Sequence, residues 1–249
     1  IGLDIAHNYL VNFGFKESRL PNDLSLALGS GNFSPAEMVR AYSVIANDGR
    51  ISNMHFVDNI QDRFGNYIFS QDEFISSNEI KNIIAFPWLD TIEMITNKPY
   101  YLLEPLDDTK QVIDPRISFL MSDVLKGFMK NGVAGRKARF LERDDIGGKT
   151  GTTNDSISTW FSGFHSDLVT TVWVGTDDFS SLGENEYGST IALPIWLNYM
   201  DYKLKSIEIT KENIPQNISF VRVNKSSGEV DIDSKENFYF ELFLDENVN

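Results

Sequence analysis

Gly147-Gly148-Lys149-Thr150-Gly151-Thr152-Thr153-Asn154 is the stretch of sequence that decides the fold, and Trp160-Phe161-Ser162-Gly163-Phe164 follows it closely. Both runs carry β-branched or aromatic residues at the period of strands. They predict strands at 148–153 and 159–164, and the apolar run behind them predicts a third at 168–175. Together they indicate a largely antiparallel sheet.

The first of these strands carries chemically useful groups. Successive side chains of a strand point to opposite faces, so Thr150 and Thr152 share one face and Lys149 and Gly151 the other. Two hydroxyls about 7 Å apart along the strand suit one carboxylate. Lys149 adds a cation, and Gly151 leaves room for another element to approach the backbone. Edge N–H groups can also stabilise an oxyanion. Acyl transfer is a chemistry that uses these parts.

Two alternatives compete with that interpretation. The octet alone is equally compatible with a polar turn between strands. Gly148-Lys149-Thr150 also matches the end of a phosphate-binding loop, but the first glycine of that pattern would fall at Arg143. The following residues, 152–156, are β-branched and turn-forming where a helix should begin. The nucleotide-binding interpretation is therefore rejected.

Helices are predicted around these strands. Ser34-Pro35-Ala36-Glu37 is a capping box with proline at the first helical position, and Asp114-Pro115 gives a similar start. The predicted helices span 1–14, 34–47, 115–131 and 193–204. Hairpins are predicted at 63–67 and between 218–223 and 230–232. The predicted fold class is mixed α/β of the α+β type, an antiparallel sheet flanked by helices.

Composition excludes several classes of function. The net charge of −14 and the lack of a Lys/Arg cluster argue against a nucleic-acid partner. The absence of cysteine excludes disulfides and thiolate sites. His7, His55 and His165 are interpreted as surface or packing residues, because none has metal-ligand spacing. We therefore expect neither metal nor cofactor.

Adjacent carboxylates offer a further candidate for acid/base chemistry. They occur as Asp144-Asp145 and Asp177-Asp178. In an acidic protein such pairs are usually solvated, and we interpret both in that way.

Four stretches resemble the transpeptidase domain of class A penicillin-binding proteins, the bifunctional peptidoglycan synthases. The stretches are Ile1 through Phe15, Leu24 through Tyr42, Asp114 through Gly148, and Lys149 through Asp178 with its continuation Leu193-Pro194-Ile195-Trp196. They cover about 60% of the chain in the family's order and are far more specific than K-T-G alone. The resemblance implies that 1–205 is the C-terminal portion of this domain, with 51–110 as an irregular insertion. Residues 206–249 are expected to form a C-terminal β-hairpin extension.

The resemblance also implies roles for the lysine strand. Lys149 is similar to the family's motif lysine, which supports the polar network of the active site. Thr150, Gly151 and Thr152 correspond to the substrate-binding segment, whose two hydroxyls hold the carboxylate of the substrate. The backbone N–H of Thr152 would be one half of the oxyanion hole. In the family, a serine attacks a stem peptide to form an acyl-enzyme, and β-lactams trap the same serine.

The chain departs from the family pattern in its other motifs and in its expected sheet. No serine has a lysine three positions later, so the S-x-x-K nucleophile is absent. S-x-N occurs at Ser30-Gly31-Asn32 and Ser76-Ser77-Asn78, but both lie after the helix that follows this motif in the family. The N-terminal strands of the family's sheet should also be missing, which leaves the sheet incomplete.

We therefore expect a catalytically silent C-terminal fragment of a peptidoglycan DD-transpeptidase. Its expected partners are stem peptides, β-lactams through the parent protein, the upstream part of the same protein, and other cell-wall synthesis proteins. The parent is expected on the periplasmic face, with any membrane anchor upstream. The alternative is a non-catalytic binding or scaffold module derived from the same fold.

Overall fold

The computed structural model describes residues 2–55, 57–70, 110–230 and 237–248. The chain divides into two compact units, one of residues 1–51 and 109–249 and the other of residues 52–108. The first unit holds the helices α1 (Leu3–Asn12), α2 (Pro35–Ala46), α5 (Pro115–Asn131), α6 (Gly135–Ala138) and α7 (Ala192–Leu204).

The three predicted strands form the central sheet of the first unit. β3 (Gly147–Thr152), β4 (Ser158–His165) and β5 (Leu168–Gly175) are antiparallel, in the order β3-β4-β5. In the part of the chain that the structure describes, no strand pairs with the side of β3 that faces away from β4, called the outer edge below. The predicted class, an antiparallel sheet flanked by helices and not closed, is confirmed.

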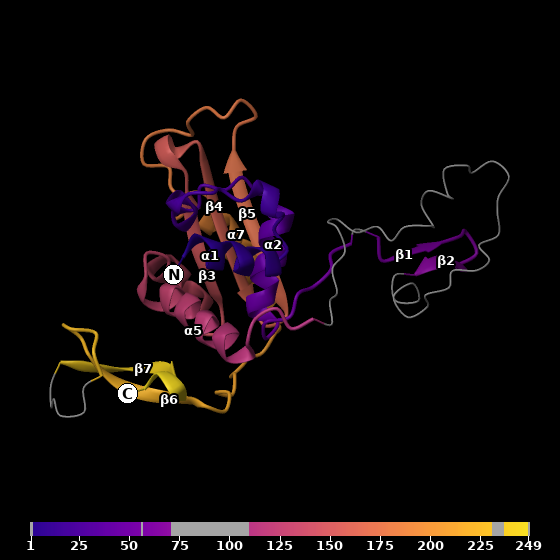
Figure 1. The fold of residues 1–249 in the computed structure, drawn as a ribbon. Helices are drawn as coiled ribbons and strands as arrows, with labels where there is room; N and C mark the ends of the chain where they lie inside the picture. The colour runs from indigo at the N-terminus through magenta and orange to yellow at the C-terminus, as the bar shows by residue number, and fades with distance from the viewer. Residues whose placement is uncertain (1, 56, 71–109, 231–236, 249) are drawn as a thin grey trace. The chain divides into compact units, whose positions relative to one another are not determined.

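Helices cover both faces of this sheet. Figure 1 shows α2 in front of β4 and β5 and α7 behind them, and α5 packs against β3. On the α7 side the ring of Phe161 lies 4.8 Å from that of Trp196, and the Trp196 indole N–H donates to the carbonyl of Thr170 at 3.1 Å. Both aromatic residues are fully buried, so this contact lies at the centre of the main core.

One glycine permits the close approach of α7 to the sheet. A Cβ added to Gly163 of β4 would lie 2.7 Å from the Gly147 carbonyl oxygen and 2.7 Å from the Trp196 ring. Neither the neighbouring strand nor the buried indole can retreat cheaply from such a contact. Glycine at 163 therefore lets the indole rest directly on the sheet.

Helix α2 begins as the sequence predicts. The Ser34 hydroxyl accepts from the Glu37 N–H at 3.3 Å, and the Glu37 carboxylate accepts from the Ser34 N–H at 2.8 Å. The helix α5 has the predicted bounds, and the Asp114 carboxylate caps it by accepting from the Arg116 N–H at 2.8 Å. Both starts satisfy backbone donors that a helix leaves without an internal partner.

The second unit contains a short hairpin, β1 (Asn59–Gln61) paired with β2 (Tyr67–Ser70). One Asp62 oxygen accepts from the N–H groups of Phe64 and Asn66, and Gly65 has a φ of +86°. The hairpin turn predicted at 63–67 is confirmed. The rest of the predicted insertion, 71–109, lies outside the described residues.

The C-terminal segment contains a strand pairing that the sequence did not predict. β6 (Ile218–Asn224) pairs along its full length with β7 (Phe238–Leu244), whereas Val230 makes only an isolated bridge to Val223. The predicted hairpin is seen at its first pair, Val223 with Val230, whereas residues 231 and 232 lie outside the described residues. Strand β7, which forms seven cross-strand pairs with β6, was not predicted.

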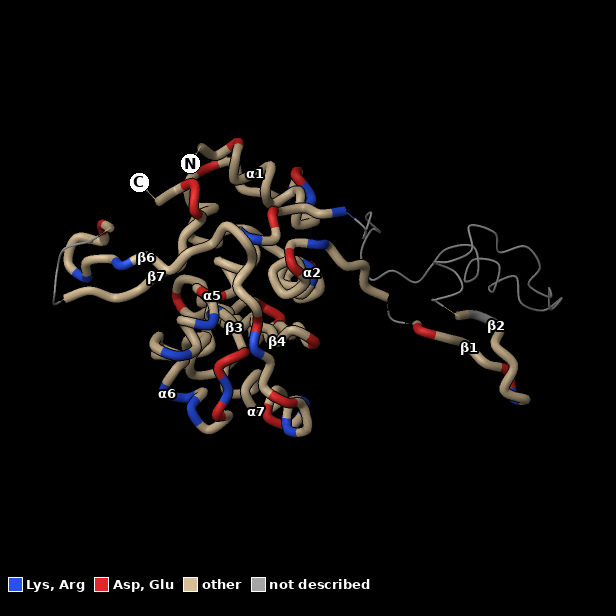
Figure 2. The backbone as a smooth tube through the Cα atoms, turned by 90° about the horizontal axis from the view of Figure 1, so that it is seen from below, with Lys and Arg blue, Asp and Glu red and all other residues tan. Residues whose placement is uncertain are grey.

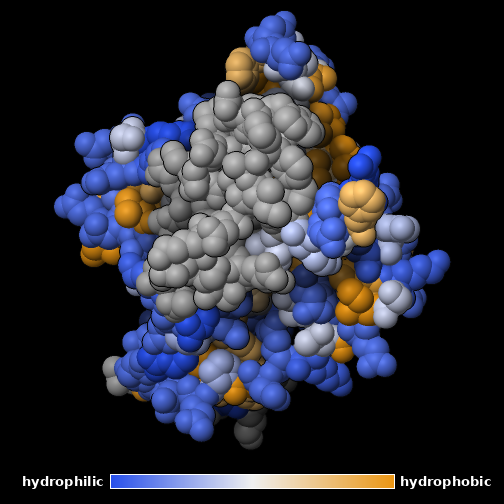
Figure 3. Space-filling model, turned by 90° about the vertical axis from the view of Figure 1, so that its right-hand side faces the viewer, coloured by the Kyte–Doolittle hydropathy of each residue, from blue (hydrophilic) through white to orange (hydrophobic). Residues whose placement is uncertain are grey.

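Hydrophilic residues predominate on one face of the described chain (Figure 3). On the face drawn in Figure 3, hydrophobic residues form small patches between hydrophilic ones. Among the described helices, none is both long enough and apolar enough to cross a membrane.

The capping box gives a stability prediction. Ser34→Ala removes the acceptor for the Glu37 N–H and should lower the free energy of unfolding by about 1 kcal/mol. Chemical denaturation measures this change. Ser206→Ala, at an exposed position after α7, is the matched control and should change stability by less than about 0.5 kcal/mol. Equal effects of the two changes would contradict a role for the cap.

Candidate active site

Lys149 extends along the outer edge of β3. Its side chain is exposed, and Nζ donates to the carbonyl of Thr150 at 3.0 Å and lies 3.4 Å from the Thr150 hydroxyl. The ammonium also lies 4.9 Å from the centre of the Phe128 ring of α5, a distance suited to a cation–π contact. The cation is thus held beside the strand and remains open to solvent.

The two threonine hydroxyls lie on the strand face opposite Lys149, as the pleat predicts. Thr150 is half-buried beside Phe161, and Thr152 is exposed. The Thr152 hydroxyl oxygen accepts from the Gly188 N–H at 2.9 Å. A hydroxyl has one donor and two acceptor sites, so this contact leaves the proton of Thr152 free to donate to a ligand.

The backbone N–H of Thr152 points to the outer edge. Its neighbour Thr153 donates its N–H toward β4, to the Ser158 carbonyl at 3.1 Å. Because the polar groups of an extended strand alternate in direction, the N–H of Thr152 points away from β4. The sequence therefore brings a cation, a hydroxyl and a backbone donor to the same edge.

The turn after β3 is held by local polar contacts. The Thr153 hydroxyl accepts from the Ser158 N–H at 2.8 Å, while Asp155 and Ser156 adopt left-handed φ values of 57° and 51°. Left-handed backbone is costly for residues other than glycine and persists where the surroundings hold it. Here the Ser156 carbonyl accepts from the Leu182 N–H at 2.9 Å. The loop between β5 and α7 thus fixes the end of the candidate site.

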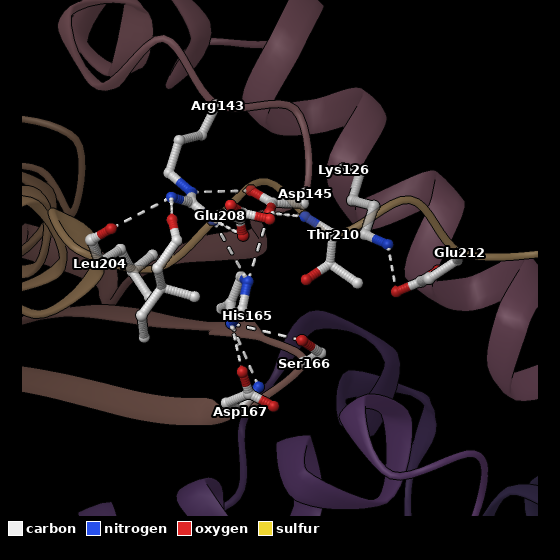
Figure 4. A network of polar contacts seen from close by, with 11 residues as sticks. Lys126, Arg143, Asp145, His165, Ser166, Asp167, Leu204, Glu208, Thr210 and Glu212 are labelled. Atoms are coloured by element: carbon white, nitrogen blue, oxygen red, sulfur yellow. Dashed lines mark hydrogen bonds and ion pairs between the residues drawn. The ribbon is translucent and has the colours of Figure 1, made fainter.

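The root of β3 is fixed by a buried polar network (Figure 4). Arg143 donates to both Asp145 carboxylate oxygens, at 2.9 and 2.7 Å, and the two side chains are 8% and 3% exposed. Since the Asp167 N–H can only donate, Nδ1 of His165 accepts from it at 3.2 Å. Nε2 of the same ring lies 3.2 Å from an Asp145 oxygen and 3.4 Å from Nη2 of Arg143.

The same network binds the end of α7 and the segment that follows it. Arg143 donates to the carbonyls of Leu204, Ile207 and Glu208, and Asp145 accepts from the Thr210 N–H at 2.8 Å. Burial alone would raise the pKa of Asp145. The hydrogen bonds from Arg143 and Thr210, with the charge of Arg143, instead hold the pKa of this carboxyl below its usual range.

This network shows that the expectation for Asp145 was wrong and agrees with the expectation for His165. Asp144 is exposed, whereas Asp145 is buried and paired, so the interpretation of both carboxylates as solvated was wrong for Asp145. His165 is fully buried and packs as expected. The sequence did contain one indication that Asp145 is paired. Arg143 lies two residues before it, and opposite charges at that spacing can pair. In the described parts of the chain, no group of acidic or histidine residues could hold a metal ion.

Comparisons with known proteins give a consistent result. The sequence model of the penicillin binding protein transpeptidase domain matches residues 10–201. Penicillin-binding protein 1A of Pseudomonas aeruginosa is 34% identical over 265 residues, covering 100% of this chain and 32% of that protein. The chain is also 36% identical over 218 residues to penicillin-binding protein 1A of Neisseria cinerea, covering 88% of this chain and 24% of that protein.

The crystal structure of penicillin-binding protein 1A from Haemophilus influenzae is also similar. The TM-score is 0.76 at 30% identity, over 98% of this chain and 36% of that one. The chain thus spans about a third or less of the length of these relatives.

The buried carboxylate gives a pH-dependent prediction. Asp145→Asn leaves Arg143 without its charged partner and should lower the free energy of unfolding at pH 7 by about 3–5 kcal/mol. Because the folded-state pKa of Asp145 is lowered, its contribution is complete above the unfolded-state pKa near 4 and is lost as the pH falls through the folded-state value. Denaturation curves at several pH values should therefore show wild type and variant converging in acid.

Asp144→Asn is the matched control. Asp144 is 63% exposed and 3.8 Å from Lys130, so its loss should change stability by less than about 1 kcal/mol. A gap between wild type and Asp145→Asn that stays constant down to the lowest pH would contradict the assignment.

Proposed function

Because the chain belongs to the penicillin-binding protein transpeptidase family, we propose that it is the C-terminal part of a DD-transpeptidase domain that crosslinks peptidoglycan stem peptides. The observation that carries the proposal is the edge of β3. Lys149, the hydroxyl of Thr152 and the N–H of Thr152 meet there with no strand paired over them among the described residues. Such an open edge suits a substrate that lies along the strand as an extended peptide.

The reaction needs a serine that this chain does not supply. In the proposed reaction the serine of an upstream S-x-x-K motif attacks the penultimate D-alanine carbonyl of a stem peptide. The C–N bond breaks, the terminal D-alanine leaves with a proton, and a serine ester remains. The amine of a second stem peptide then attacks the ester, forms the crosslinking amide and returns the proton to the serine.

Each β3 residue has a proposed part in these steps. The N–H of Thr152 donates to the carbonyl oxygen as it gains negative charge, and the Thr150 and Thr152 hydroxyls hold the substrate's terminal carboxylate. The positive charge of Lys149 stabilises both the carbonyl oxygen as it becomes negative and the carboxylate of the substrate. Gly151 has no side chain and so keeps the strand surface clear. β-Lactams, which carry a carboxylate beside a strained amide, would enter the same site and acylate the same serine.

The setting of the protein follows from the same family membership. We place the parent protein on the periplasmic face of the bacterial cytoplasmic membrane, with the upstream part of the same protein completing the active site. Cell-wall synthesis proteins are its proposed further partners.

The missing serine gives the first functional prediction. The 249-residue chain alone should form no stable covalent adduct with a labelled penicillin, because a cation and an oxyanion donor do not replace the nucleophile. The full-length protein should be labelled on a serine upstream of residue 1. Gel fluorescence and peptide mass mapping check both. A covalent adduct on the isolated chain would contradict the prediction that it is inactive. An upstream sequence without S-x-x-K and S-x-N would favour the alternative of a non-catalytic scaffold module.

Lys149 gives the second functional prediction. In the full-length protein, Lys149→Ala should lower the second-order rate constant of penicillin acylation by about 10²-fold, the usual cost of removing one electrostatic contact to the transition state. Lys130→Ala, which removes an exposed lysine of α5 outside the site, is the control and should leave acylation unchanged. Stopped-flow or gel-based acylation rates measure the effect. Similar rates for the two variants would refute the role of Lys149.

A further inference from the structure

Gly188, in the loop between β5 and α7, lies directly on the backbone of the sheet. A Cβ added to it would lie 2.5 Å from the Trp160 carbonyl oxygen, 2.6 Å from the Gly151 carbonyl oxygen and 3.2 Å from the Gly151 nitrogen. All three are backbone atoms of paired strands, so they cannot move aside as a flexible side chain would. Any larger residue at 188 must lift the loop away from β3.

The polar groups of Gly188 connect β3 with the core helix. Its N–H donates to the Thr152 hydroxyl at 2.9 Å, and its carbonyl accepts from the Leu193 N–H at 2.8 Å. Leu193 is fully buried in the main core. Gly188 itself is buried although the residues on either side of it are partly or fully exposed. The position of the Thr152 hydroxyl is thus tied to the buried core of the first unit.

A second contact holds this loop from the other side. Lys137 of α6, in the region where Figure 2 shows several basic residues, donates to the Ser189 carbonyl at 2.6 Å. The Tyr187 N–H donates to the Thr190 hydroxyl at 2.7 Å, which closes the turn around Gly188. The loop segment that carries Gly188 is therefore fixed at both ends.

This contact determines the direction in which Thr152 can donate. With one lone pair of its oxygen engaged by Gly188, the hydroxyl rotates less freely, and its proton is directed away from the loop. An oriented donor binds a carboxylate more tightly than a free rotor, because less conformational entropy is lost on binding.

We propose that Gly188 is a positioning residue for recognition of the substrate carboxylate, acting through the hydroxyl of Thr152. The proposal rests on the proposed transpeptidase function. It assigns to the loop between β5 and α7 a share in distinguishing acyl donors that carry a free carboxylate from those that do not.

The test compares two probes on the full-length protein. Benzylpenicillin carries the free carboxylate, and benzylpenicillin methyl ester lacks it. Gly188→Ala should lower the ratio of their acylation rate constants by about 10-fold, because displacement of a positioned group by about 1 Å can cost up to 10²-fold. Acylation by the ester should change little.

A double-mutant cycle separates positioning from general damage. Thr152→Val removes the hydroxyl at nearly constant volume, so Gly188→Ala added to it should cause no further fall in the ratio. Gly127→Ala in α5 is the matched control, since a Cβ there meets no atom within 4 Å. If Gly188→Ala does not fold, Lys137→Met decides the question, because it loosens the same loop at an exposed contact and should lower the ratio in the same direction.

Each outcome is decisive. An equal fall for both probes, or an unchanged ratio in the variant that folds, overturns the role of Gly188 while leaving the transpeptidase function standing. Equal rate constants of acylation of the wild-type protein by the two probes also overturn the role of Gly188, because Thr152 then recognises no carboxylate. A wild-type protein that neither probe acylates is the distinct failure of the proposed function itself.

Discussion

The register between β3 and β4 is the constraint on which the rest of the structure depends. A shift of one residue would exchange the faces of Lys149 and Thr150 and would turn the N–H of Thr152 inward. Shape complementarity helps to prevent this shift. Gly148 lies where a Cβ would be 2.7 Å from the Phe161 ring, and Phe161 itself is held against Trp196. A shift that brought Lys149 to the position of Gly148 would place a side chain against this buried ring.

The sequence predicted those features whose causes are local. Helix α5 begins at Pro115 and ends at Asn131 because a cap, a proline and a following glycine lie within the segment itself. The face shared by Thr150 and Thr152 follows from the pleat alone. What it could not predict depends on partners far along the chain. Strand β6 pairs with β7, which lies beyond the predicted hairpin, and Arg143 and Asp145 bond backbone groups 61 and 65 residues away.

Two anchors therefore hold the ends of β3. The Arg143–Asp145–His165 network binds its root to the chain after α7, and the loop with Gly188 binds its tip to the chain before α7. Helix α7 lies between these two anchors and fills the core with Leu193, Trp196 and Met200. Among the described residues β3 has one neighbouring strand, and helix α7 supplies the further support that the proposed site requires.

The buried network also determines how this unit can open. Arg143 bonds the carbonyl of Leu204 at the end of α7 and two carbonyls beyond it, so the segment 204–210 cannot leave the sheet unless the guanidinium gives up all of these contacts together. Amide hydrogens of β3 and of 204–210 should thus exchange with solvent as one cooperative unit, with a common opening free energy.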